Sequence, residues 1–163
     1  MIIGIISGYF NPIHVGHVDY IEGAGRLCDR LYVIVDNDRQ MVRNFLSEHV
    51  VDLKGSTRSM SEESRVKIVG ALQAVDRVVL SIDDGPTVVD SIKKIYEDNR
   101  NDPFIVGFTF MSGGDRQEGN TPETVFCEQN GISLQYNVGR EKTESSNTPI
   151  EGVREEFCSD KQS

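Results

Sequence analysis

Two histidines three positions apart are the most informative residues of the sequence. His14 and His17 follow a β-branched apolar run, residues 2–6, and a loop that contains Gly8 and Pro12. At a strand-to-helix junction of this kind, the free N–H groups and the positive dipole end of the helix attract phosphate. Imidazoles there can donate hydrogen bonds to charge that builds on a phosphoryl group and its leaving group. The pair therefore predicts a phosphate site, against two alternatives: plain surface histidines at a helix start, and a zinc site that lacks a clear third ligand.

The elements that must position these histidines alternate along the chain. Apolar runs predict buried strands at residues 2–6, 30–35, 77–82, 104–110 and 133–138. Amphipathic stretches predict helices at residues 17–28, 61–74 (capped by Ser61), 87–99 and 123–130, with a short helix around 41–45. This order is typical of an α/β fold: a Rossmann-like, doubly wound parallel sheet of five strands with helices on both faces.

Ligands of such sheets bind outside the carboxyl ends of the strands. Two polar segments fall at that edge independently of each other. One is the loop from Gly8 to His17 after the first strand, and the other is the Gly-Gly-Asp-Arg sequence of residues 113–116 after the fourth. We expect the two segments to face the same ligand.

Length and composition bound the class of protein. A chain of 163 residues with 37% hydrophobic residues is enough for one domain, expected at residues 1–150, with the end of a C-terminal helix and a polar tail at 151–163. A net charge of −9 disfavours a nucleic acid as partner, since phosphate-tracking surfaces are basic. No apolar run approaches the roughly 20 residues of a membrane helix, so no membrane partner is expected.

The cysteines and the N-terminal residues indicate the cellular compartment of the protein. The three cysteines, Cys28, Cys127 and Cys158, are widely spaced, which favours reduced thiols over a disulfide framework or a zinc site. The first residues carry no basic stretch of the kind that begins a secretory signal. Both observations predict a cytoplasmic protein.

Residues 7–17, with the sequence SGYFNPIHVGH, resemble the signature of the cytidylyltransferase-like nucleotidyltransferase superfamily. In that signature a glycine, an aromatic residue and Asp or Asn precede an HxGH motif. Residues 29–38 resemble the second strand of this superfamily, and residues 113–116 and 145–147 resemble its late motifs. Residues 53–56, 63–65 and 71–79 are similar to the glycerol-phosphate and heptose-phosphate branches. The resemblance extends over residues 1–148. It departs from the common pattern at Asn147 and Pro149, and in a longer stretch between residues 38 and 54.

The resemblance implies roles for particular residues. His14, His17 and Lys54 would be the catalytic residues that contact the phosphates, and Asp38 and Arg65 would bind the substrate. The nucleotide would be bound by Gly8, Tyr9, Phe10, Asn11, Gly16, Gly114, Asp115, Arg116, Ser145 and Ser146. The alternatives are a solvated lysine at 54, a capping or surface role for Arg65, loop-structural roles at 115–116 and a plain helix cap at 145–146.

The activity that the resemblance implies is transfer of a nucleoside monophosphate to a phosphorylated small molecule, such as a polyol or sugar phosphate, with release of pyrophosphate. Mg²⁺ would be bound together with the nucleoside triphosphate, and no metal site made of protein residues is expected. Resemblance to relatives that form dimers also implies a homodimer. Overall likeness favours CTP, whereas residues 53–79 and the Gly-Gly-Asp sequence favour ATP. Two other classes stay open: a nucleotide-binding sensor or partner subunit without catalysis, and an adaptor that keeps only the fold.

Overall fold

The sheet was traced in a computed structural model that describes residues 1–48, 60–114 and 119–139. Its five strands are β1 (Ile2–Gly8), β2 (Arg30–Val35), β3 (Arg77–Leu80), β4 (Gly107–Gly113) and β5 (Ser133–Val138). They lie in the order β3-β2-β1-β4-β5, and every neighbouring pair is parallel. The predicted five-stranded parallel sheet is confirmed.

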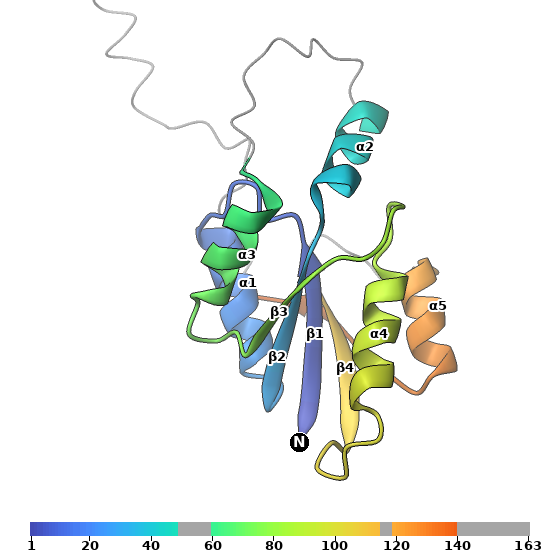
Figure 1. Cartoon of the computed structure of the whole chain (residues 1–163). Coiled ribbons are helices and arrows are strands. Elements are labelled where there is room, and N and C mark those ends of the chain that lie inside the picture. Colours follow the sequence, from blue (N-terminus) through green and yellow to red (C-terminus); the bar gives the residue numbers. More distant parts are fainter. Residues whose placement is uncertain (49–59, 115–118, 140–163) are drawn as a thin grey trace, which may run out of the picture.

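Helices cover both faces of this sheet, as predicted (Figure 1). The helices are α1 (Val15–Gly25), α2 (Asp38–Glu48), α3 (Glu62–Gly70), α4 (Val89–Asn99) and α5 (Pro122–Gln129). In Figure 1, α1 and α3 lie on one side of the sheet and α4 and α5 on the other, whereas α2 extends beyond the carboxyl end of β2. The predicted cap of α3 is present, because the Ser61 side chain accepts a hydrogen bond from the Ser64 N–H at 3.2 Å.

The period-2 alternation of the strands divides the interior into two cores. On β1, Ile3 and Ile5 face the core that α4 and α5 cover, and Ile6 faces the core under α1 and α3. These side chains are at most 1% exposed. Each contributes roughly 1.5–3 kcal/mol through burial of apolar surface. The cores hold the carboxyl end of β1, and with it the loop to His14, in a fixed place.

The fourth strand begins later than the apolar run predicts. The run starts at Phe104, but β4 starts at Gly107, and Phe104 and Val106 are 73% and 79% exposed. A turn at Asp102 explains the difference: its side chain accepts the Phe104 N–H and its carbonyl accepts the Ile105 N–H. Because the strand is displaced, Gly113 is its last residue and does not follow it.

The strand order places a switch point beside β1. The chain moves outward from β1 to β3 and then crosses over, so that β4 pairs with the opposite edge of β1. Ligands of open parallel sheets bind at such a point, outside the carboxyl ends of the strands. Here those ends are Gly8 and Gly113.

Candidate nucleotide site

The loop after β1 is anchored by a buried aromatic ring. Phe10 has a φ of 53°, an uncommon backbone conformation for a side chain of this size, and is only 1% exposed. Its ring meets the His17 ring edge-to-face, with the centroids 5.2 Å apart. A Cβ at Gly8 would come within 3.0 Å of the Phe10 ring, so a larger residue there would require the ring to shift. Any contribution of Phe10 to nucleotide binding must therefore come from its backbone or from its support of His17.

His14 and His17 form a reciprocal cap at the start of α1. Nδ1 of His14 accepts the Gly16 N–H at 3.1 Å, and Nδ1 of His17 accepts the His14 N–H at 3.2 Å. The two rings stack with centroids 3.8 Å apart and planes inclined by 29°. The structure thus brings both imidazoles together at a helix N-terminus, whereas their contact with phosphate stays a prediction.

The cap also selects the tautomer of both rings. A neutral imidazole accepts through one nitrogen and carries its hydrogen on the other. Because Nδ1 accepts a backbone N–H in both His14 and His17, the hydrogen belongs on Nε2 in each neutral ring. Two Nε2–H donors on adjacent rings, beside the N–H groups of the first helical turn, are an arrangement suited to phosphate oxygens.

Asn11 ties the loop to the elements that follow β2. Its Oδ1 accepts the Met60 N–H at 2.9 Å, and its Nδ2 lies 3.0 Å from Met41 Sδ on α2. The side chain is partly buried in these contacts. A nucleotide role for Asn11 stays a prediction.

Arg65 is placed inside the protein. Its side chain is 0% exposed and lies 2.7 Å from Asp38 Oδ1. The guanidinium also donates to the carbonyls of Tyr9 (2.8 Å), Asp36 (2.6 Å) and Met60 (3.1 Å). These contacts favour a structural role, in which Arg65 holds together the loop after β1, the end of β2 and the start of α3. The substrate contact predicted for Arg65 and Asp38 stays a prediction, which this geometry does not support.

A second polar junction near the site was not predicted. Asn37 and Gln40 cap α2 reciprocally: the Asn37 N–H donates to Gln40 Oε1 at 3.1 Å, and the Gln40 N–H donates to Asn37 Oδ1 at 2.9 Å. Their amide groups donate onward to carbonyls of the loop between β3 and α4, at Ser81, Asp83, Gly85 and Thr87. Both side chains are buried. The spacing Asn-x-x-Gln is itself a capping-box signal and would have predicted the longer α2.

The remaining predicted residues divide into two groups. Gly114 follows the end of β4 and is exposed, and a Cβ there would meet nothing within 4 Å, so protein packing does not require glycine at this position. Lys54, Asp115, Arg116, Ser145 and Ser146 lie outside the described residues.

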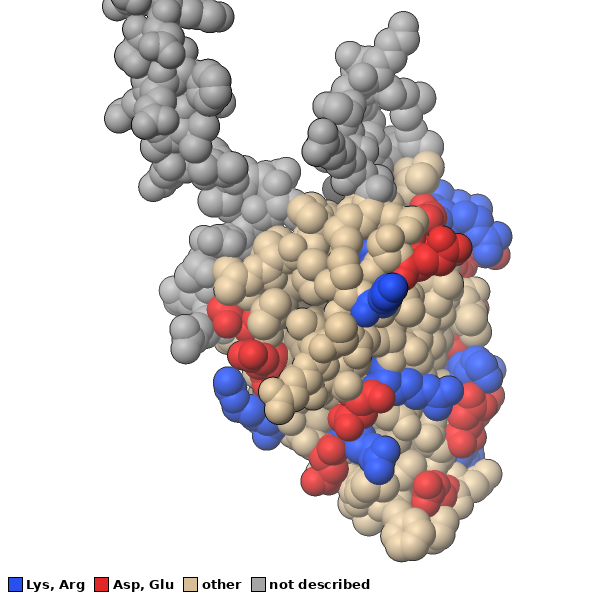
Figure 2. Space-filling model, turned by 60° about the vertical axis from the view of Figure 1, so that its left-hand side comes forward, with Lys and Arg blue, Asp and Glu red and all other residues tan. Residues whose placement is uncertain are grey.

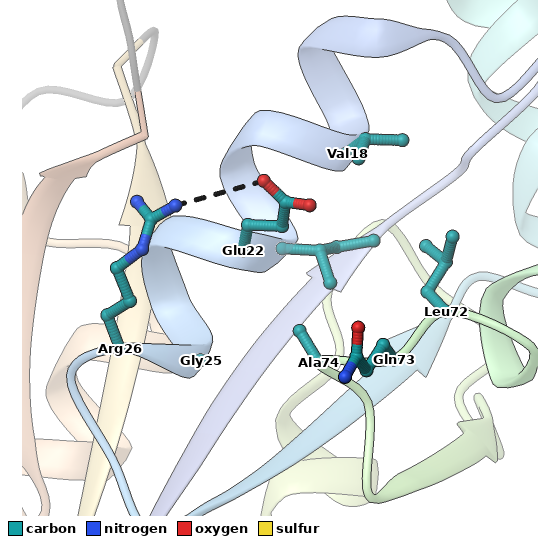
Figure 3. A pocket seen from close by; sticks show the side chains of 8 residues that line it. Val18, Glu22, Gly25, Arg26, Leu72, Gln73 and Ala74 are labelled. Carbon is teal, nitrogen blue, oxygen red and sulfur yellow. Dashed lines mark ion pairs between the residues drawn. The ribbon is translucent and has the colours of Figure 1, made fainter.

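A hollow of about 270 Å³ lies elsewhere, between α1 and residues 72–74 (Figure 3). Glu22 on α1 and Arg26, which directly follows the helix, line it and form an ion pair with a nitrogen–oxygen distance of 3.8 Å. None of the residues predicted for the site is among those that line it, which are Val18, Ile21, Glu22, Gly25, Arg26, Leu72, Gln73 and Ala74. The chemistry predicted at α1 therefore belongs to the helix N-terminus and not to this hollow.

On the face shown in Figure 2, basic and acidic side chains are interspersed. No helix in residues 1–48, 60–114 or 119–139 is long and apolar enough to cross a bilayer. Within these ranges no three His, Cys, Asp or Glu side chains are grouped as metal ligands.

Known proteins resemble this chain in both sequence and fold. The bifunctional protein HldE of Gluconobacter oxydans is 40% identical over 84 residues, which are 51% of this chain and 16% of that protein. HldE of Nitrobacter hamburgensis is 38% identical over 85 residues, 52% of this chain and 16% of that protein. The matched region is thus a small part of these relatives.

A solved structure supports the fold. The lipopolysaccharide core biosynthesis protein from Thermoplasma volcanium aligns with a TM-score of 0.58 and 22% identity, over 86% of this chain and 99% of that one. The cytidylyltransferase-like family matches residues 5–117, which include the second half of β1, all of β2 to β4 and both histidines. The chain belongs to the cytidylyltransferase-like family, which confirms the nucleotidyltransferase superfamily predicted from its HxGH sequence.

Proposed function

We propose that this protein transfers a nucleoside monophosphate from a nucleoside triphosphate to a phosphorylated small molecule of the sugar or polyol class. The observation that carries the proposal is the reciprocal cap of His14 and His17, which fixes both Nδ1 atoms as acceptors at the N-terminus of α1. Family membership and the position of this cap at the switch point of the sheet support it.

In the proposed reaction, a phosphate oxygen of the acceptor attacks the α-phosphorus of the triphosphate. A new P–O bond forms, the bond between the α-phosphorus and the bridging oxygen breaks, and that oxygen leaves with pyrophosphate. Negative charge grows on the α-phosphoryl oxygens and on the leaving group. The Nε2–H groups of His14 and His17 would donate to this charge, and the positive end of the α1 dipole would add to the field.

Other residues would complete the site. Lys54 would bring a positive charge to the phosphates, Asp115 and Arg116 would contact the nucleotide beyond β4, and Ser145 and Ser146 would bind the outer phosphates. Gly114 would let the nucleotide approach the main chain, which its open surroundings support. Mg²⁺ bound to the triphosphate would neutralise phosphate charge. Mg²⁺ commonly keeps several waters and substrate phosphates as its ligands, so it would need few contacts from the protein.

CTP is the first nucleotide to test and ATP the second. CTP follows from the overall likeness to glycerol-3-phosphate cytidylyltransferase. ATP follows from the likeness of residues 53–79 to heptose-phosphate adenylyltransferases, and the HldE proteins that are 38–40% identical over about half of the chain give that branch independent support. The same relatives favour a sugar phosphate as acceptor.

The test is pyrophosphate release with each of the four ribonucleoside triphosphates, Mg²⁺ and a panel of sugar and polyol phosphates. We expect release that requires one triphosphate and one acceptor together, with a nucleotide-linked product in mass spectra. A thermal shift with CTP or ATP, without release from any pair, would favour a nucleotide-binding sensor or partner subunit. Neither binding nor release would favour an adaptor that keeps only the fold. Sedimentation of the same sample tests the proposed homodimer.

A further inference from the structure

Tyr20 joins α1 to the carboxyl end of β4. Its hydroxyl donates to the Met111 carbonyl at 2.8 Å, across 91 positions of sequence. Its ring is partly buried against the core under α1 and α3. A Cβ at Gly113 would lie 3.6 Å from this ring, so the ring packs directly over the last residue of β4. The hydroxyl and the ring thus contact the strand end that leads to Gly114.

The end of β5 is shaped to meet the same tyrosine. While β4 advances from Met111 to Gly113, its partners on β5 advance from Gln135 to Val138, so that β5 carries one extra residue there. Asn137, inside this irregularity, has a φ of 56°. The irregularity redirects the strand just before it reaches α1.

Gly139 makes the contact that follows. It has a φ of 93°, and a Cβ there would come within 3.0 Å of Tyr20 Cα and 3.3 Å of Tyr20 N. A Cβ at Gly23 on α1 would likewise come within 3.0 Å of the Gly139 nitrogen. Main chain therefore packs on main chain between α1 and the end of β5, and α1 has little freedom to shift along either strand.

Tyr20 lies one helical turn after His17, so this junction fixes the distance between the imidazole pair and the end of β4. We propose that Tyr20 is a positioning residue for the nucleotidyl transfer proposed above, on which this inference rests. Through Met111 and Gly113 it sets the separation between the Nε2–H donors at the start of α1 and Gly114 at the end of β4. A triphosphate that contacts both would have its in-line geometry at the α-phosphorus set by that separation.

The role of the hydroxyl can be separated from that of the ring. Tyr20→Phe keeps the apolar ring and its packing on Gly113, and removes the hydroxyl that donates to the Met111 carbonyl. Tyr96→Phe is the matched control, because Tyr96 lies on α4, on the opposite face of the sheet from α1, where its ring packs on Phe108. Both substitutions delete one phenolic oxygen from a partly buried ring.

With the nucleotide and acceptor identified by pyrophosphate release, we expect Tyr20→Phe to lower kcat by about 10-fold or more while the KM for the triphosphate changes less than about twofold. The reason is that binding contacts survive while alignment is lost. Tyr96→Phe should leave both constants unchanged, with both variants compared well below their melting temperatures. The proposal is overturned if the two variants have the same kcat, whether both match the wild type or both lose activity equally.

A second measurement keeps the inference independent of activity. The ring signals of His14 and His17 in NMR spectra of the full chain report the position of α1 at its N-terminus. We expect Tyr20→Phe to shift these signals and Tyr96→Phe to leave them in place. Unshifted signals overturn the positioning role even if no substrate pair is found, whereas failure of the wild-type protein to release pyrophosphate overturns the proposed function alone.

Discussion

The Arg65 guanidinium lies 2.7 Å from Asp38 Oδ1, and the arginine side chain is wholly buried while the aspartate side chain is 46% exposed. This pair joins the start of α2 to α3. Because Arg65 also donates to the carbonyls of Tyr9 and Asp36, the same cation fixes the ends of β1 and β2. A buried cation of this kind needs its counter-ion, since desolvation costs it several kcal/mol.

Removing the counter-ion should therefore destabilise the fold. We expect Asp38→Ala to lower the free energy of unfolding by about 2–3 kcal/mol, somewhat less than the 3–5 kcal/mol of a fully buried pair because water reaches one partner. Urea denaturation measures the change. Asp98→Ala is the control, since it removes the exposed Lys94–Asp98 pair and should cost less than about 0.5 kcal/mol. Equal losses in the two variants would show that Arg65 does not depend on Asp38.

The cap and the proposed chemistry of His14 can be tested apart. Asparagine is a good helix cap, so His14→Asn keeps an acceptor for the Gly16 N–H but presents no Nε2–H. We expect roughly 10²–10³-fold lower kcat and a melting temperature close to that of the wild type. His14→Ala should show the same kcat loss and, in addition, about 1 kcal/mol of lost stability. Less than a threefold loss of kcat in His14→Asn would contradict the proposed role.

The sequence predicts most of the sheet because the strands are encoded by local apolar runs. Residues 30–35 and 133–138 form strands with the predicted bounds. The run at residues 104–110 misled the prediction because apolar character cannot distinguish a strand from the turn that Asp102 holds at its start. Only the register with β1, a long-range property, shows that β4 begins at Gly107.

The candidate site shows the same division between local and long-range signals. The HxGH spacing is local, and it correctly placed His14 and His17 together at a helix start. The surroundings of Arg65 are not local: its partners Tyr9, Asp36 and Asp38 lie 27 to 56 positions away and meet only through the parallel sheet. Because these partners are distant in sequence, the sequence alone predicted a substrate contact for Arg65, whereas the structure buries its side chain.

Gly4 should tolerate no side chain. A Cβ there would lie 2.4 Å from Met111 Cε, 2.6 Å from Cys28 Sγ and 2.9 Å from Cys28 Cβ. We expect Gly4→Ala to lower the free energy of unfolding by about 1–3 kcal/mol through overpacking. Gly107→Ala on β4, where a Cβ meets nothing within 4 Å, is the control and should be close to neutral. Thermal denaturation compares the two, and a neutral Gly4→Ala would mean that Met111 and Cys28 move aside freely.

The stability of the protein in alkali should depend on Cys127. Burial, with Glu123 and Glu128 nearby, raises the pKa of this thiol to about 12 in the folded protein, above its ordinary value of 9.0. The unfolded chain then loses the proton first as pH rises, so the stabilising effect of the neutral buried thiol is complete below pH 9.0 and is lost towards pH 12. Relative to Cys127→Ala, the wild type should lose up to about 1.4 kcal/mol per pH unit in that window. Urea denaturation of both proteins between pH 8 and 10.5 measures the difference, and a difference that stays constant with pH would show that the folded thiol titrates at its ordinary value.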